Sequence, residues 1–299
     1  MSSLRLLITG GGGLLGSKVA EIAVKQGYEV YAGYYDHMAS NGVPLLLDIR
    51  DKKALSKAFK MINPEGVIHS AALTDVDMCE KEKELAWQIN VEGTRNVAEK
   101  SREHNAFLVY VSTDYVFSGQ KGMYREMDET GPINHYGLTK LEGENIVKKS
   151  LSEWCIARPS VIYGSTPAGG KVNFALWALN NLRAGEMINV VTDQWVSPTL
   201  NTNLAQMIQE IVERRLTGIY HLAGATPLSR YEFTLLIAEA FNLNKSLMNP
   251  AESRAMNWIA KRPENSSLNV QKALETLKNK PLKIDDALTK LGEELPIRS

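Results

Sequence analysis

The sequence predicts an α/β fold, in which a doubly wound parallel sheet carries helices on both faces and a second, smaller lobe accompanies it. Two patterns predict this class. Short apolar segments alternate with segments of helical periodicity along the first half of the 299 residues, which is typical of a parallel sheet covered on both faces. A run of glycines also separates the first strand from the first helix, where a tight turn is required.

Each element of the first half has its own signal. Residues 5–9 form a short, mainly apolar run that glycines follow, which suits a buried strand. In residues 14–25, Leu15, Val19 and Ile22 share one helical face. Residues 106–112 are rich in β-branched and aromatic side chains. The expected strands are 5–9, 29–35, 43–47, 66–69 and 106–112, and the expected helices are 14–25, 52–61 and 84–104.

The second half continues the alternation less regularly. We expect strands at 155–162, 189–192 and 218–224 and helices at 174–183, 204–214 and 231–241. The strand at 218–224 is expected to rejoin the sheet. Turn signals at Asn249-Pro250, Arg262-Pro263 and Lys280-Pro281 make the remainder suitable for a small lobe.

Composition and charge exclude several classes of function. Lys and Arg number 34, as do Asp and Glu, so bulk charge gives no basis for nucleic-acid binding. Two cysteines cannot form a disulfide framework or a four-ligand zinc site, and we expect no metal centre. No apolar run of about 18 residues predicts a membrane span, and the run near Leu6 is too short for a signal peptide. A soluble, cytoplasmic protein is therefore expected.

The turn after the first strand is typical of a dinucleotide-binding site. Glycines at positions 10, 13 and 16 permit a tight turn and a close approach of the backbone to a pyrophosphate. The following helix presents free N–H groups and the positive end of its dipole to that anion. Because a strand precedes the turn and a helix follows it, the sequence predicts a Rossmann fold that binds a dinucleotide.

The end of the second strand bears on the choice between NADP and NAD. In NAD-specific sites an acid at this position bonds the ribose hydroxyls. Here the strand ends in Tyr34-Tyr35, with no acid before Asp36 and no arginine to attract a ribose phosphate. We expect NADP, with NAD as the alternative. Asp48, after the third strand, is placed beside the adenine, a role compatible with capping the next helix.

A hydroxyl, a phenol and an ammonium group follow the fifth strand. Tyr136 and Lys140 are four residues apart and therefore share one helical face. The ammonium group is expected to lower the pKa of the phenol towards neutrality, where it serves as an acid or base. Thr113, at the end of the strand, is suited to donate a hydrogen bond to a carbonyl oxygen. The three residues predict acid–base catalysis at a carbonyl group.

These segments together resemble the extended short-chain dehydrogenase/reductase superfamily, and within it the dTDP-4-dehydrorhamnose reductase family. The resemblance spans about residues 4–270 and rests on Thr9–Gly16, Ala71–Glu80, Ile89–Asn96, Ser112–Gly119, Tyr136–Glu144 and Asp193–Thr199. It implies that NADPH reduces the 4-keto group of a nucleotide-linked deoxyhexose to make dTDP-L-rhamnose. Thr113, Tyr136 and Lys140 would be catalytic, and Asn90 a structural or proton-relay accessory.

The expected contacts form two sets. The cofactor would contact Gly10, Gly13, Leu14, Leu15, Gly16, Tyr34, Asp48, Ile49, Ala71, Ala72, Thr74, Asn90, Tyr136 and Lys140. The nucleotide-sugar substrate would contact Val76, Asp77, Tyr115, Val161, Asn173, Gln194, Trp195, Arg230 and Arg262. An arginine grips a diphosphate bidentately, although a solvated surface position is the alternative for Arg230 and Arg262.

Two departures and three alternatives bear on the activity. The reductases usually carry glycine at Val196 and threonine at Pro159, which leaves the sugar open. Dehydratases of the superfamily carry an Asp-Glu pair after the active-site threonine, whereas this chain has Asp114-Tyr115, which argues against elimination. A 4-epimerase, another carbonyl reductase, and an NADP-binding regulatory subunit like the β subunit of methionine adenosyltransferase stay as alternatives.

These inferences suggest a division of the chain. A dinucleotide-binding domain is expected at residues 1–165, with 200–223 rejoining it, and a smaller substrate-binding lobe at 166–199 and 224–299. Clefts between lobes are common ligand sites. Members of the superfamily often form dimers, so a homodimer is expected from the resemblance alone.

Overall fold

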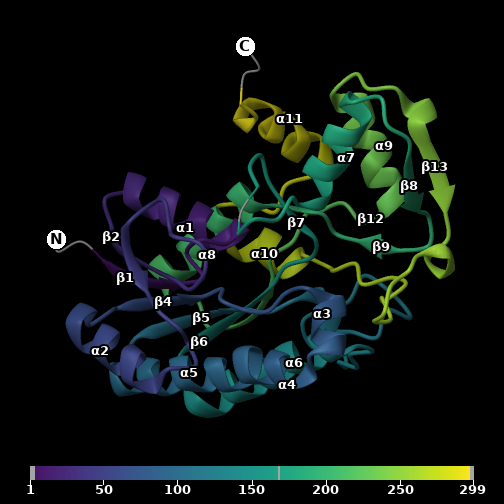
Figure 1. Ribbon diagram of the computed structural model, residues 1–299. Helices are drawn as coiled ribbons and strands as arrows, with labels where there is room; N and C mark the ends of the chain where they lie inside the picture. Colours follow the sequence, from purple (N-terminus) through teal and green to yellow (C-terminus); the bar gives the residue numbers. More distant parts are fainter. Residues whose placement is uncertain (1–3, 168, 297–299) are drawn as a thin grey trace.

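The computed structural model describes residues 4–167 and 169–296 (Figure 1), so the outer ends of the two predicted lobes lie outside the described residues. Seven strands form one sheet in the order β11-β6-β5-β4-β1-β2-β3, and every neighbouring pair is parallel. The strands are β1 (Arg5–Thr9), β2 (Glu29–Tyr34), β3 (Val43–Leu46), β4 (Gly66–His69), β5 (Phe107–Val111), β6 (Trp154–Arg158) and β11 (Gly218–His221). The predicted fold class is confirmed.

Helices cover both faces of this sheet (Figure 1). Apolar side chains of α1 (Leu14–Lys25), α8 (Asn201–Arg214) and α10 (Gln271–Thr276) share one buried core with the sheet. The opposite core contains side chains of α2 (Lys52–Ile62), α5 (Gly93–Glu103) and α6 (His135–Ser150). Because both faces are covered, every residue of β4 and β5 is buried, and all of them are apolar except His69 at the end of β4.

The long helix predicted at 84–104 is wrong in one respect. The structure has α4 (Lys83–Trp87), a wider π-helical stretch η1 (Gln88–Glu92), and then α5. The bulge places the Asn90 side chain against a backbone segment far away in sequence, where its amide bonds both the N–H and the C=O of Leu73. Such π-bulges are frequently found at functional sites.

The strand predicted at 155–162 is also wrong, because it ends at Arg158. Val161 has a φ of 38°, which no strand residue adopts. Ile162 and Tyr163 form a separate short strand β7, which pairs with β10 (Thr199–Leu200) instead of continuing in the sheet. The break turns the chain out of the sheet towards the second lobe.

The second lobe packs three helices around its own apolar core (Figure 1). These are α7 (Phe174–Arg183), α9 (Arg230–Ala240) and α11 (Ile284–Glu294). Two strand pairs border them: β8 (Ile188–Val191) with β13 (Met248–Ala251), and β9 (Trp195–Val196) with β12 (Leu228–Ser229). The segment that contains α10 and α11 is turn-rich in sequence, and neither helix was predicted.

The remaining elements are short: α3 (Val76–Lys81) and the 3-10 turns η2 (Asp114–Val116), η3 (Lys245–Leu247) and η4 (Ser253–Ala255). Within residues 4–167 and 169–296, none of the helices has the length and apolar character needed to cross a bilayer. The boundaries proposed for the two lobes stay a prediction.

Candidate functional site

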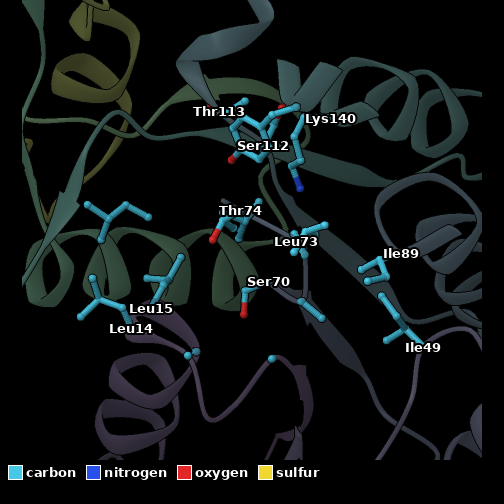
Figure 2. A pocket seen from close by; sticks show the side chains of 18 of the residues that line it. Leu14, Leu15, Ile49, Ser70, Leu73, Thr74, Ile89, Ser112, Thr113 and Lys140 are labelled. Carbon is cyan, nitrogen blue, oxygen red and sulfur yellow. The ribbon is translucent and has the colours of Figure 1, made fainter. Parts of the chain in front are cut away.

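A cleft of about 880 Å³ lies at the carboxyl ends of the sheet strands. It receives residues that follow β1, β2, β3, β4 and β5, and it includes the point where strand order reverses between β1 and β4, as expected for a doubly wound sheet. Figure 2 shows Leu14 and Leu15 on one side and Thr113 and Lys140 on the other. Fourteen of the predicted cofactor and catalytic residues line it: Gly10, Gly13, Leu14, Leu15, Gly16, Tyr34, Asp48, Ile49, Ala71, Ala72, Thr74, Thr113, Tyr136 and Lys140.

The glycine turn lines the cleft at the end of β1. Gly10 has a φ of 73°, and a Cβ there would lie 2.8 Å from the backbone nitrogen of Ala71. A Cβ on Gly16 would overlap the carbonyl oxygen of Gly10. Helix α1 starts after Gly13 with no side-chain cap, which leaves its first-turn N–H groups available for an anion. The turn therefore fits a pyrophosphate.

The end of the cleft beside β3 carries an ion pair. The Asp48 carboxylate accepts hydrogen bonds from Arg50 Nε at 2.9 Å and Nη2 at 2.7 Å, and these bonds hold the pKa of Asp48 below its usual range. Two expectations are corrected here. Asp51, and not Asp48, caps α2, and an arginine does line this part of the cleft.

A chain of hydrogen bonds holds the loop after β4 in place. Thr9 Oγ1 lies 2.7 Å from His69 Nδ1, and His69 Nε2 lies 3.0 Å from Thr94 Oγ1. Thr9 Oγ1 also accepts a hydrogen bond from Ala71 N–H. Asn90 does not line the cleft but bonds Leu73, so it supports the same loop.

The three predicted catalytic residues meet at the far end of the cleft. Thr113 follows β5, while Tyr136 and Lys140 lie on the first turns of α6. Figure 2 shows the amino group of Lys140 pointing into the cleft, although its side chain is only 2 % exposed. Lys140 Nζ lies 4.2 Å from the ring centroid of Tyr110. The meeting of these groups at one wall follows from β5 and α6 packing together.

The pKa values at this wall differ from the expectation. Burial raises the pKa of Tyr136, and the Thr113 hydroxyl is the group that acts to lower it. Burial also lowers the pKa of Lys140 to about 7, although Glu144 opposes this. The expected net lowering of the Tyr136 pKa is therefore wrong, because burial outweighs the groups that act to lower it.

A buried carboxylate beside Thr113 was not singled out from the sequence as part of the site. Asp114 is 3 % exposed and accepts hydrogen bonds from the hydroxyls of Thr113 (3.1 Å), Ser160 (2.8 Å) and Ser266 (2.6 Å). Burial raises its pKa, and the hydroxyls oppose that shift. Asp114 thus ties the turn after β5 to a segment 152 residues away, which no local sequence signal indicates.

A second buried carboxylate links α6 to the sheet. Glu144 is fully buried and accepts hydrogen bonds from Arg158 Nε at 2.8 Å, Arg158 Nη2 at 2.7 Å and Ser112 Oγ at 2.6 Å. Because Ser112 precedes Thr113 and Glu144 lies one helical turn after Lys140, these bonds fix the position of the helix relative to the strand end.

The predicted substrate residues divide into two groups. Val76, Tyr115, Val161 and Arg230 line the cleft. The other five do not: Asp77, Asn173, Gln194, Trp195 and Arg262.

The side chains of four of those five form hydrogen bonds or ion pairs elsewhere. Gln194 Oε1 accepts a hydrogen bond from Arg230 Nε at 3.0 Å, and Asp77 pairs with Arg262 at 3.0 Å. Asn173 caps α7. Gln194 therefore contacts Arg230, whose guanidinium carbon also lies 4.7 Å from the ring centroid of Phe174.

Further lining residues were absent from the predicted sets. They are Tyr35, Asp36, Leu47, Arg50, Ser70, Leu73, Leu85, Ile89, Val111, Ser112, Asp114, Pro159 and Ile162. Most of them flank a predicted residue in sequence, so the signal that could have found them is proximity to a strand end. In the part of the chain that the structure describes, no three His, Cys, Asp or Glu side chains are grouped to hold a metal.

The chain is similar to one protein family and to several known proteins along most of its length. Residues 4–296 match the family described as "RmlD substrate binding domain". The chain is 34% identical over 281 residues to a dTDP-4-dehydrorhamnose reductase of Aggregatibacter actinomycetemcomitans, covering 90% of this chain and 91% of that protein. It is also 34% identical over 276 residues to methionine adenosyltransferase 2 subunit beta of Xenopus tropicalis, covering 90% and 81%. The crystal structure of dTDP-4-dehydrorhamnose reductase from Bacillus anthracis in complex with NADP matches with a TM-score of 0.88 and 32% identity, covering 98% and 100%.

Proposed function

The chain belongs to the RmlD substrate binding domain family, and from that premise we propose that it is an NADPH-dependent reductase of a 4-keto nucleotide sugar, foremost dTDP-4-dehydrorhamnose. One observation carries the proposal: Thr113, Tyr136 and Lys140 line the same cleft as the glycine turn. A carbonyl group and a dinucleotide can therefore be held side by side. The reductase of Bacillus anthracis, whose structure contains NADP, supports the choice of cofactor.

The residues of the cleft fit a dinucleotide. A Cβ at Gly10 or Gly16 would collide with the backbone, and the first turn of α1 has no side-chain cap, so this turn would hold the pyrophosphate. When bound, NADPH supplies a hydride to the carbonyl carbon. Asp48 and Ile49 would contact the adenosine end, while Lys140 would contact the ribose next to the nicotinamide.

Tyr136 is the proton donor in this proposal. Because burial raises its pKa, the phenol stays protonated at neutral pH, as reduction of a carbonyl requires. The Thr113 hydroxyl donates to Asp114 and accepts from the N–H of Tyr115. Rotation about its Cβ–Oγ bond directs the same proton to a substrate oxygen, which holds that oxygen beside the phenol.

Lys140 stabilises the product of proton transfer. Its pKa of about 7 means that a substantial fraction is protonated at neutral pH, and a positive charge beside Tyr136 favours the phenolate that forms. Glu144 acts to raise that pKa. The reaction is then expected to slow at alkaline pH, where Lys140 loses its charge.

Replacement of Tyr136 by phenylalanine tests the proposal. We expect kcat with NADPH and dTDP-4-dehydrorhamnose to fall at least about a hundredfold, the usual contribution of one acid–base group. The assay follows NADPH oxidation against a panel of 4-keto nucleotide sugars, with NADH in parallel. Tyr163→Phe is a matched control, because Tyr163 is buried outside the cleft and its Oη has no hydrogen-bond partner in the described structure. Normal turnover by Tyr136→Phe would contradict the assignment.

A regulatory role is the second candidate, because the methionine adenosyltransferase β subunit of Xenopus tropicalis matches over 90% of this chain. In that case the cleft would bind NADP while the protein serves a partner synthetase. Purification from the native cell with mass spectrometry distinguishes the two. A stoichiometric synthetase partner together with no ketosugar-dependent NADPH oxidation would favour the regulatory role.

We also propose that the two lobes bind different ligands. Residues 1–165 with 200–223 would hold the dinucleotide, and the lobe of residues 166–199 and 224–299 would hold the sugar nucleotide. Arg230 supports this division, because it lines the cleft from the second lobe and is held by Gln194. Its guanidinium suits the substrate diphosphate. A cytoplasmic location and a homodimer stay predictions.

A further inference from the structure

The adenosine end of the cleft carries groups with opposite preferences for NADP and NAD. Strands β2 and β3 pair in parallel, with Tyr34 opposite Leu46, so the residues that follow the two strands are neighbours. Tyr35 and Asp36 directly follow β2, Arg50 lies in the loop after β3, and all three line the cleft. No arginine lies at the end of β2, but the loop after the neighbouring strand β3 supplies one.

Arg50 is held in place on two sides. Its guanidinium carbon lies 5.3 Å from the ring centroid of Tyr35, and its Nε and Nη2 bond the Asp48 carboxylate. The side chain nevertheless remains 31% exposed. A guanidinium fixed in this way loses little conformational freedom when it binds an anion, and it presents several N–H donors to phosphate oxygens.

We propose that Arg50 is the residue that selects NADP over NAD, by binding the phosphate on the adenosine ribose. This inference rests on the proposed function only in that the cleft takes a dinucleotide. Arginine near the end of the second strand is the usual partner of a 2′-phosphate, and an arginine–phosphate contact is strong because it is charge-assisted. Asp36, which is exposed at the same end, acts against the phosphate by repulsion.

If Arg50 had a different role, its loss would change the affinities for NADP and NAD differently. If the guanidinium serves only to orient Asp48 towards the adenine, its loss weakens NADP and NAD alike, because both carry the same adenine. If Arg50 contacts the phosphate, its loss weakens NADP selectively. The ratio of the two dissociation constants therefore separates the roles.

The experiment measures Kd for NADP⁺ and NAD⁺ by titration calorimetry on the full chain, and so needs no sugar substrate. For Arg50→Ala we expect the ratio Kd(NADP⁺)/Kd(NAD⁺) to rise at least about tenfold, the size of one charged hydrogen bond. Asp36→Asn is expected to lower the ratio. Arg95→Ala is the matched control, since Arg95 forms an exposed ion pair with Glu92 at 3.1 Å and does not line the cleft.

Arg50→Lys is the second variant, which retains the charge without the planar guanidinium, and a rise in the ratio smaller than that of Arg50→Ala is expected. An unchanged ratio in Arg50→Ala, or a loss equal for both dinucleotides, would overturn the inference. Wild-type protein that binds neither dinucleotide would overturn the proposed function instead.

Discussion

The buried ion pair between Arg158 and Glu144 allows a quantitative prediction. The two side chains are 1% and 0% exposed, and Arg158 supplies two of the hydrogen bonds to Glu144, at 2.8 and 2.7 Å. In Arg158→Met, the carboxylate retains only Ser112 and the more distant Lys148 Nζ, at 3.4 Å. Since loss of one partner leaves a buried charge uncompensated, the free energy of unfolding at pH 7 should fall by about 3–5 kcal/mol.

The effect has a defined pH dependence. Burial raises the pKa of Glu144, but the bonds and charge of Arg158 and the Ser112 hydroxyl outweigh it, so the net pKa lies below 4.5. In the wild type this stabilisation is present above pH 4.5 and is lost as the pH falls below it. In Arg158→Met burial dominates and the pKa should rise above 4.5. The deficit relative to wild type should therefore be largest at neutral pH and shrink towards pH 5.

The assay is urea unfolding followed by circular dichroism at pH 7 and pH 5. The double variant Glu144→Gln/Arg158→Met removes both charges and is expected to be more stable than Arg158→Met by about 1–3 kcal/mol. A loss below about 1 kcal/mol at pH 7, or a deficit equal at both pH values, would refute the reasoning, because a buried unpaired carboxylate has neither property. Such a result would mean that water reaches Glu144 in the variant.

Two further predictions concern the glycine turn and a buried histidine. Gly16→Ala places a Cβ against the carbonyl oxygen of Gly10 and should weaken NADP⁺ binding, measured by calorimetry, at least about tenfold. Gly131→Ala is the control, because its Cβ would lie 3.8 Å from Ser118 Cβ and binding should not change. Equal NADP⁺ affinities of the two variants would contradict this prediction. Burial lowers the pKa of His69 to about 3, so the unfolded chain takes up a proton as the pH falls below 6.5 and stability is lost. His69→Gln should lose less stability than wild type between pH 7 and pH 5 in urea unfolding, and an identical loss would rule the histidine out.

The parts of the site that the sequence predicted are local. The glycine turn connects a strand directly to the helix that follows it, and Tyr136 and Lys140 are placed together by the helical repeat. Apolar runs predicted the buried strands β1, β4 and β5, because the centre of a strand covered on both faces is apolar. The conformation of such residues depends on neighbours that are close to them in sequence.

The parts that the sequence missed depend on distant segments. Arg50 reaches the end of β2 only because β2 and β3 pair in parallel. Asp114 is satisfied by Ser266, 152 residues away. The strand predicted through Val161 ends early because its backbone turns to φ 38° and Ile162 pairs with Thr199. Such contacts have no periodicity along the chain.

The pKa values of Tyr136 and Lys140 also separate what the sequence predicts from what the fold decides. From the sequence, the spacing of Tyr136 and Lys140 alone predicted that an ammonium group would acidify a phenol. The tertiary structure decided otherwise, because it buries both groups and so raises the pKa of Tyr136 and lowers that of Lys140 to about 7. The sequence by itself determined that Tyr136 and Lys140 share one face of a helix, through local geometry. Only the fold determined their protonation states, because desolvation depends on every segment that packs around them.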